Sequence, residues 1–321
     1  KAKNVPAGGW AFEFHNNYYP DVDDTAEIVL AINKMRPRSE MKSSKVIRRA
    51  VMWVLGMQSS NGGWGAFDKD NTRGFIAKLP FTDFGETIDP PSVDVTAHVI
   101  EMLAHLDYKK DNPNVSQALA YIFNEQEPDG SWFGRWGVNY IYGIGAVLPA
   151  LKNSNIDMSI LPVRKAVKWL EVHQNDDGGW GESCSSYVTS KTIGQGPSTP
   201  SQTSWALIAL LSAGEVHNPV VSKGIRYLVD TQGEDGSWEE PYFTGTGFPG
   251  YGTGQKPDRY LEPGDRRYQS EELSAGFMLN YHMYRIYWPL TALGRYRNEI
   301  LKSGQNESRS PSKETILSYA N

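Results

Sequence analysis

Three aspartates stand within four residues in the stretch PDVDDTAEIVL, which runs from Pro20 to Leu30. They are Asp21, Asp23 and Asp24, and an apolar pattern with helical spacing follows them at once. Capping explains one or two carboxylates at a helix start, since they accept backbone N–H bonds and face the positive end of the helix dipole. The third carboxylate is surplus. Because crowded carboxylates oppose simultaneous ionisation, such a cluster can retain a proton at neutral pH and act as an acid.

A histidine is the next residue whose type could take part in acid–base chemistry. His98 lies in the apolar stretch DVTAHV, four residues after Asp94. Residues four apart share one face of a helix, so Asp94 is placed to orient or to charge this imidazole. Taken by itself, a single histidine on an apolar helix is more commonly a satisfied core residue than a catalytic one.

The composition excludes several classes of function. The 321 residues carry 32 Lys and Arg against 37 Asp and Glu, and this net charge of -5 argues against a nucleic-acid partner. A single cysteine, Cys184, excludes internal disulfides and a multi-cysteine metal site. No apolar run approaches the roughly 18–20 residues of a membrane-spanning helix. Because the first residue is Lys1 and not methionine, we expect this chain to begin inside a longer protein.

A repeated segment organises the chain. Each copy has an apolar helical stretch with an aromatic residue, then a glutamine, a polar turn with glycine, and a tryptophan. The glutamines are Gln58, Gln126, Gln174 and Gln232, and the tryptophans are Trp64, Trp132, Trp180 and Trp238. Irregular spacing between copies is typical of helical hairpins with variable loops. We expect each glutamine amide to join the end of one outer helix to the start of the next.

More strongly apolar helices are expected between the repeats, over residues 24–35, 93–106, 138–151, 201–213 and 277–293. They are apolar around much of their circumference, as inner helices are, whereas the segments before each glutamine are amphipathic. This alternation predicts an all-α fold, an (α/α)6 barrel that lacks its N-terminal helices. We expect one barrel domain over residues 1–302 with an insertion near 250–273, and a polar tail over 303–321.

These motifs together resemble a known family. The repeats resemble the QW motifs of triterpene cyclases, and residues 21–24 resemble the Asp-x-Asp-Asp motif of bacterial squalene–hopene cyclases. The stretches MQSSNGGWGAFDKDN, DPPSVDVTAHV, GSWFGRWGVNYIYG, STPSQTSWAL and YFTGTGFPG are similar to that family in the same order. The resemblance covers residues 6–297. It implies the C-terminal of two α/α barrels, with the N-terminal second barrel absent from this chain.

The resemblance implies acid-initiated polycyclisation of squalene to pentacyclic products of the hopene or hopanol type, through carbocations. It makes Asp23 the proton donor, with Asp21 and Asp24 tuning its acidity. His98 then corresponds to the histidine that hydrogen-bonds the acid. Tyr142 matches a tyrosine near the same network, on the path of reprotonation.

The second requirement of that chemistry is to stabilise cations without quenching them, which aromatic faces do by roughly 0.5–2 kcal/mol each. By resemblance the candidates are Phe12, Phe67, Trp136, Trp169, Phe248, Phe277, Tyr281 and Tyr284. Phe248 and Phe277 are expected to lie where late cations form, and Tyr281 and Tyr284 are expected one helical turn apart. Core packing alone would also explain these rings. Phe67 departs from family members that have tyrosine there, which removes a hydroxyl near the early rings.

Other functions remain open from the sequence. One is a class II cyclase of another polyprene, either a C35 terpene or a prenyl diphosphate, and an oxidosqualene cyclase is a further neighbour. Another is a non-catalytic α/α-toroid that serves as a binding module, for which Asp23 would be dispensable. We expect no metal site and no cofactor, because the cyclisation is redox-neutral.

The resemblance also implies partners and a location. The expected partners are squalene or a similar polyprene, the N-terminal half of the protein, a membrane surface and a second copy in a homodimer. The expected location is the cytoplasmic side of a bacterial inner membrane, with peripheral, monotopic attachment. Phe81 and the stretch IAKLPFTDFGE match the channel region of the family.

Overall fold

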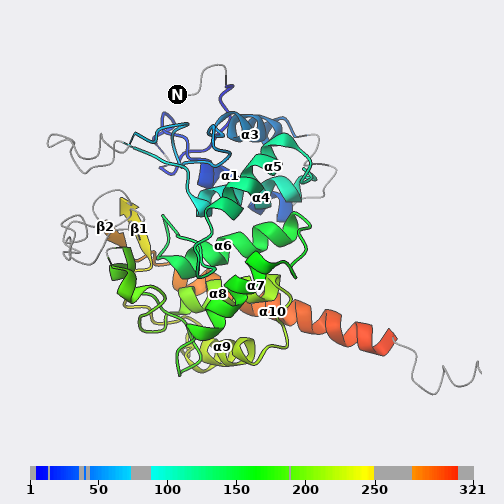
Figure 1. Ribbon diagram of the computed structural model, residues 1–321, viewed down its shortest axis with the longest axis vertical. Coiled ribbons are helices and arrows are strands. Elements are labelled where there is room, and N and C mark those ends of the chain that lie inside the picture. The colour runs from blue at the N-terminus through cyan, green and yellow to red at the C-terminus, as the bar shows by residue number, and fades with distance from the viewer. Residues whose placement is uncertain are drawn as a thin grey trace, which may run out of the picture.

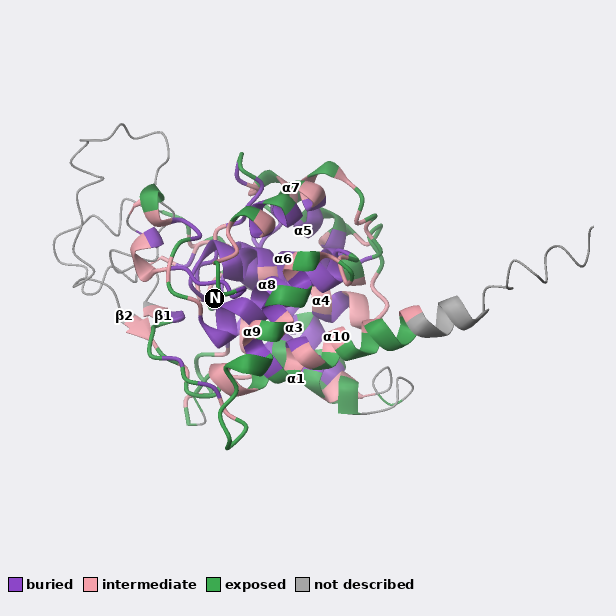
Figure 2. Cartoon of the chain, turned by 90° about the horizontal axis from the view of Figure 1, so that it is seen from below, coloured by how far each residue is buried: buried purple, intermediate pink, exposed green. Residues whose placement is uncertain are grey.

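The computed structural model describes residues 5–13, 15–35, 40, 44–73, 88–187, 189–248 and 277–309. Five of the helices within these residues form an inner layer, in which each helix packs on the next (Figure 1). In chain order they are α1 (Val22–Met35), α4 (Val93–His105), α6 (Tyr140–Asn153), α8 (Pro200–Ser212) and α10 (Tyr284–Arg309). Figure 2 shows that buried residues concentrate on α4, α6 and α8, in the middle of this layer.

The remaining α-helices of the described part form an outer layer. They are α3 (Lys45–Gly56), α5 (Pro113–Asn124), α7 (Leu161–Val172) and α9 (Pro219–Asp230). α3 packs on α1, α5 packs on α4, α7 contacts both α6 and α8, and α9 packs on α8. The predicted all-α class and the alternation of inner and outer helices are therefore confirmed. Two short 3-10 helices, η3 (Cys184–Tyr187) and η4 (Ser190–Thr192), lie in the loop before α8.

Helix composition explains which layer each helix joins. Every residue of α8 is buried, so its apolar residues need no polar face. In α9 the buried residues are Val221, Gly224 and Leu228, which repeat at the spacing of one helix face. The start of α9 is set by Asn218, whose side chain accepts the Val220 N–H, and by a proline in the first turn.

Three of the four repeated glutamines join successive outer helices, as the sequence predicts, whereas in the described residues Gln232 bonds only to the nearby Gly236 carbonyl. Gln58 Nε2 donates to the carbonyls of Gly62 and Asn114, at 2.8 and 2.9 Å, and Asn114 lies in the first turn of α5. Gln126 and Gln174 make the equivalent pairs of bonds to the starts of α7 and α9. These amides therefore fix the spacing of neighbouring outer helices.

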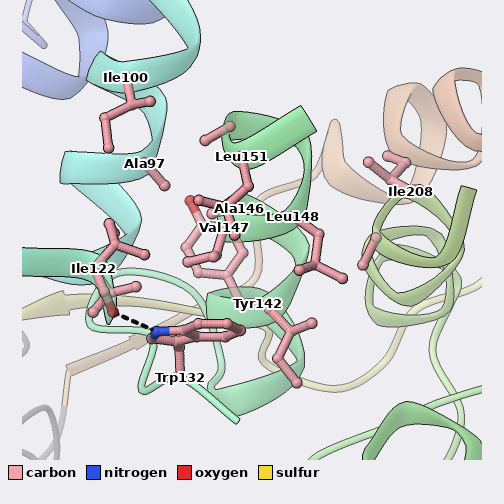
Figure 3. Close-up of a cluster of buried hydrophobic side chains, with 14 of the residues drawn as sticks. Ala97, Ile100, Ile122, Trp132, Tyr142, Ala146, Val147, Leu148, Leu151 and Ile208 are labelled. Atoms are coloured by element: carbon pink, nitrogen blue, oxygen red, sulfur yellow. Dashed lines mark hydrogen bonds between the residues drawn. The ribbon is translucent and has the colours of Figure 1, made fainter. Parts of the chain in front are cut away.

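The repeated tryptophans are fully buried and close the last turn of the preceding outer helix. Trp132 Nε1, for example, donates to the Ile122 carbonyl at 2.8 Å (Figure 3). Trp64, Trp180 and Trp238 make the same bond to the carbonyl ten residues earlier. The repeats therefore build the scaffold.

One predicted helix boundary is wrong. Residues Phe277–Leu279 form strand β2, which pairs antiparallel with β1 (Gly245–Phe248), and α10 begins only at Tyr284. The insertion expected near 250–273 and Phe81 with its neighbours lie outside the described residues. Helix α10 continues to Arg309, so the first residues of the expected tail are helical, and residues 310–321 are not described. Among the described helices, none combines the length and the apolar character that crossing a membrane requires.

Candidate active site

The aspartate motif lies at the N-terminus of α1, where it is held by two loops. Asp21 directly precedes the helix, and its Oδ1 accepts a hydrogen bond from the Asp24 backbone N–H at 3.0 Å. The Asp21 N–H donates to the Trp10 carbonyl, and the Val22 N–H donates to the Ala66 carbonyl. One aspartate therefore caps the helix, and its neighbours are free for another role.

His98 on α4 faces this motif. Its Nδ1 lies 2.6 Å from Asp23 Oδ1 and 3.8 Å from Glu27 Oε1. Asp23 and Glu27 are one helical turn apart on α1, so both carboxylates reach the same imidazole. The structure thus brings together an aspartate and a histidine that are 75 residues apart in the chain.

Burial and charge shift the proton affinities of these groups. Burial, together with the charges of Asp23 and Asp24, raises the pKa of Asp21 to about 8. Burial and the charge of Asp23 raise the pKa of Asp24 to about 6. Burial alone would lower the pKa of His98, but the charge and hydrogen bond of Asp23 and two further carboxylates outweigh it, and this pKa is about 10. At neutral pH the cluster therefore holds a proton on the imidazole and another among the carboxyls.

The negative charge of Asp94 favours the protonated form of His98, but Asp94 makes no hydrogen bond to it within the described part of the chain. Its Oδ2 instead accepts the backbone N–H groups of Arg135, at 3.0 Å, and Trp136, at 2.7 Å. After the larger effects of burial and Asp23, the charge of Asp94 contributes to the raised pKa of His98. Asp94 therefore also fixes the loop that carries a candidate aromatic residue.

Tyr142 lies against the edge of His98. The two ring centroids are 6.1 Å apart and the rings are nearly perpendicular, at 83°. Figure 3 shows Tyr142 on α6 among the apolar side chains that α4, α6 and α8 contribute to the core. Burial raises the pKa of its hydroxyl well above the usual range, so Tyr142 stays neutral.

Two pairs of the predicted aromatic residues meet. Phe67 and Trp136 lie edge to face with centroids 6.1 Å apart, and Tyr281 and Tyr284 stack at 4.7 Å. Tyr281 precedes α10, so this stacking arises from the turn before the helix rather than from helical spacing. The charges of the aspartate motif act, after burial, to raise the pKa of Tyr281.

The other predicted aromatic residues are less clearly joined to the site. Phe12 is 62% exposed. Trp169 is 3% exposed, lies on the outer helix α7 and stacks on His173, and it meets none of the other candidates among the described ring contacts. The backbones of Phe248 and Phe277 are paired across β1 and β2, and their side chains lie outside what the structure describes.

Two residues of the site were not predicted. Glu27 could have been found from its position one turn after Asp23. Trp205 lies in STPSQTSWAL, a stretch that contributes to the family resemblance, but its place beside Tyr142 depends on how α8 packs on α6. Sequence spacing carries no signal for such a contact.

The arrangement suits delivery of a proton to a weakly basic group. A carboxyl at Asp23 that loses its proton becomes an anion 2.6 Å from the imidazole of His98. A hydrogen bond to an ionised group is about twice as strong as one between neutral groups. The site therefore stabilises the carboxylate that proton delivery leaves on Asp23.

Comparison with known proteins identifies the family. Residues 1–253 match the family of the squalene-hopene cyclase C-terminal domain. The chain is 48% identical over 300 residues to squalene–hopene cyclase from Alicyclobacillus acidocaldarius. The aligned region covers 94% of this chain and 44% of that protein. It is 44% identical over 295 residues to the enzyme from Zymomonas mobilis, covering 91% of this chain and 41% of that protein.

A solved structure supports the fold. A variant of the type II terpene cyclase MstE from Scytonema, in complex with geranylgeranyl dihydroxybenzoate, superimposes with a TM-score of 0.62 at 17% identity, over 92% of this chain and 78% of that one. The chain spans less than half the length of the two squalene–hopene cyclases above. The superposition on MstE shows that it has the fold of a terpene cyclase. By the family match and these identities, the chain belongs to the squalene-hopene cyclase family and corresponds to its C-terminal domain.

Proposed function

We propose that the protein to which this chain belongs cyclises squalene to pentacyclic triterpenes of the hopene or hopanol type, with Asp23 as the proton donor. The observation that carries the proposal is the 2.6 Å contact between Asp23 Oδ1 and His98 Nδ1, with Asp21 and Asp24 beside it. The relatives named squalene–hopene cyclase support the substrate class.

The first step transfers the proton of the Asp23 carboxyl to a terminal double bond of squalene. The alkene electron pair forms the new C–H bond and leaves a tertiary cation, while His98 stabilises the carboxylate that remains. Further double bonds then add to successive cations. The last cation loses a proton to give a hopene, or adds water and then releases a proton to give a hopanol, so the reaction needs no oxidant or reductant.

The cations need faces that attract positive charge without adding to it. Trp136, Tyr281 and Tyr284 are partly buried, and Phe67 packs on Trp136. We assign the early cations to this group. Phe248 and Phe277 stand side by side on paired strands, which supports a shared role at the late cations. Loss of either ring should release partly cyclised products.

A complete cavity requires more chain than these residues. We propose that the N-terminal half present in the longer relatives closes the site and excludes water from the cations. Squalene is an apolar hydrocarbon, which supports attachment to a membrane surface. Co-sedimentation with lipid vesicles tests that part separately.

The test uses the protein with its N-terminal half, incubated with squalene, and mass spectrometry of the products. The wild type should form multi-ring products, and Asp23→Asn should form none while its circular dichroism is unchanged. Asp157→Asn, a fully exposed aspartate, is the matched control and should behave as the wild type. Full turnover by Asp23→Asn would reject the donor. Cyclisation of a prenyl diphosphate in place of squalene would reject only the substrate.

A further inference from the structure

Trp205 is the hub of an aromatic cluster that begins at His98. It lies on α8 and is 2% exposed. Its ring centroid lies 4.7 Å from that of Tyr142, 5.8 Å from that of Tyr284 and 6.0 Å from that of Trp288. Trp205 thus connects the ring that touches His98 with rings on α10. Edge contacts at these separations add to the energy of burial and favour one ring orientation.

Gly137 lies directly against the Tyr142 ring. A Cβ built on Gly137 would lie 2.4 Å from Tyr142 Cγ, and 2.5 and 2.6 Å from the two Cδ atoms. Real Cβ atoms essentially never come so close, so the ring rests directly on the glycine backbone. Any side chain at this position would displace Tyr142.

The backbone of Gly137 cannot easily retreat from the ring. Its carbonyl accepts the Tyr187 hydroxyl at 2.7 Å, and Gly137 forms a β-bridge with Gly245. The neighbouring Val138 N–H donates to the Thr244 carbonyl at 2.9 Å. The glycine is therefore fixed from both sides, and the strain of an added methyl group would fall on Tyr142.

We infer that Gly137 and Trp205 are positioning residues that hold the Tyr142 ring against His98, and so keep the Asp23–His98 pair in the geometry that proton transfer requires. This inference rests on the proposed function. Its structural part, the coupling of these residues to His98, stands apart from that function and is measured without substrate.

The first test is Gly137→Ala, with two readouts. Displacing Tyr142 loosens the geometry of the Asp23–His98 contact and so weakens the interaction that raises the pKa of His98. The pKa of His98, followed by NMR of labelled histidine with His98→Gln to assign the signal, should fall by about 1 unit or more. The kcat for squalene should fall by about 100-fold, since small misplacements cost that much, with KM nearly unchanged. Gly294→Ala is the control, because its Cβ would meet nothing.

A double-mutant cycle separates positioning from general damage. If Gly137→Ala acts through the Tyr142 ring, it should have no further effect on His98 in a Tyr142→Ala background. A further fall of similar size in that background would overturn the inference. An unchanged His98 in the single variant would also overturn it.

The second test concerns Trp205. Trp205→Leu should lower the pKa of His98 as Gly137→Ala does, and Trp205→Phe, which keeps an aromatic edge, should restore most of the loss. Trp238→Leu also removes a fully buried tryptophan, but that ring only closes α9, so His98 should not change.

Because Trp205→Leu risks unfolding, Trp205→Phe and Gly137→Ala carry the decision. A shift in Trp205→Phe as large as that in Gly137→Ala, or a shift in Trp205→Leu no larger than that in Trp238→Leu, would contradict the inference. A shifted His98 in a protein that does not cyclise squalene would leave the positioning intact and reject only the function.

Discussion

The carboxylates at the start of α1 differ in environment although they are close in sequence. Asp21 is buried and caps the helix, whereas the Asp23 side chain is 28% exposed and bonded to His98. Asp21 therefore caps the helix, while Asp23 is the carboxylate that contacts His98. The surplus aspartate is thus explained by a division of roles.

The raised pKa of Asp21 makes stability depend on pH in a direction unusual for an aspartate. Between the ordinary pKa of 3.8 and the folded value of about 8, the unfolded chain has released a proton that the folded chain keeps. Stability should therefore fall as pH rises through this range. Asp21→Asn removes the effect, and its free energy of unfolding at pH 8 should exceed that of the wild type by on the order of 1–3 kcal/mol. Urea denaturation from pH 4 to pH 8 measures this difference.

Asp235 provides the control for that series. Hydrogen bonds from Ser237 lower its pKa from the ordinary 3.8, so its contribution to stability is complete above about pH 5, and the difference between Asp235→Asn and the wild type should be nearly constant from there to pH 8. A difference between Asp21→Asn and the wild type that does not vary with pH would contradict the assignment of the retained proton. Asp21→Asn should also reduce cyclisation, because the carboxyl group that neighbours Asp23 is replaced by an amide, which cannot exchange a proton.

Substitution of His98 should affect the rate more than binding. Its bond to Asp23 strengthens as the acid loses its proton, so it stabilises the transition state more than the bound substrate. His98→Ala should lower kcat for squalene by about 100-fold and change KM by less than about 3-fold. His105→Ala, on the same helix but bonded to the Glu101 carbonyl, is the control. A loss confined to KM would make His98 a packing residue.

At the residue scale, sequence reasoning reached the groups that have recognisable chemistry. Asp23 and His98 were placed in one site from their types and the family resemblance. The Asp94 bonds to the loop at residues 135–136 and the place of Trp205 were not predicted, since both depend on packing between helices distant in sequence. Trp169 was predicted to be one of the cation-stabilising rings. It lies on the outer helix α7 and stacks on His173 instead of meeting the other predicted rings among the described ring contacts.

At the scale of elements, the repeats join helices through specific bonds, and these bonds are unequal. Gln58 is buried and bonds to Gly62, to the Asn114 carbonyl and to the Asn114 side chain. Gln232 is exposed, and within the described residues its amide bonds only to the Gly236 carbonyl. The glutamine at the last repeat therefore has less to join than the first.

This inequality predicts different costs for one substitution. Gln58→Ala leaves buried carbonyls unpaired and should lower the free energy of unfolding by about 1–3 kcal/mol. Gln232→Ala changes an exposed group and should cost about 0.5 kcal/mol or less. Urea denaturation of both variants decides the matter, and equal costs would show that the bridge to the next helix contributes nothing.

Helices were predictable where the apolar pattern extended over many residues. The short stretch at residues 277–279 was less predictable. The short apolar run there is compatible with either a helix or a strand. Its pairing with residues 245–248, more than two dozen positions earlier in the chain, makes it a strand, and local sequence contains no trace of that partner. Predicting α10 from residue 277 extended a true helix by several residues.

At the scale of the whole molecule, the described inner helices pack in the chain order α1, α4, α6, α8 and α10. Tyr18, Tyr19 and Phe12 are exposed beside the aspartate motif. We expect residues 1–321 alone to form no multi-ring product from squalene, because water reaching the site would level the acidity of Asp23 and trap cations. A separately expressed N-terminal half should restore activity when the two are mixed. Multi-ring products from the isolated residues at the rate of the whole enzyme would contradict this.

The global architecture was largely predictable because it follows from repetition. Repeats with a fixed order of helix, glutamine, glycine and tryptophan define outer helices, and the apolar segments between them define inner ones. The boundary of the polar tail was less predictable. Helix α10 passes it and continues to Arg309, although its polar sequence contains Gly304.

The most direct measurement of the central claim follows the proton itself. If Asp23 exchanges its proton with solvent and then delivers it to squalene, reaction of the complete protein in D2O must place one deuterium on the methylene carbon of the first ring that was the CH carbon of the terminal double bond. Mass spectrometry should then show hopene that is one mass unit heavier than the product formed in H2O, and Asp23→Asn should show no product. Cyclised product without deuterium, formed at the normal rate, would contradict protonation by this site.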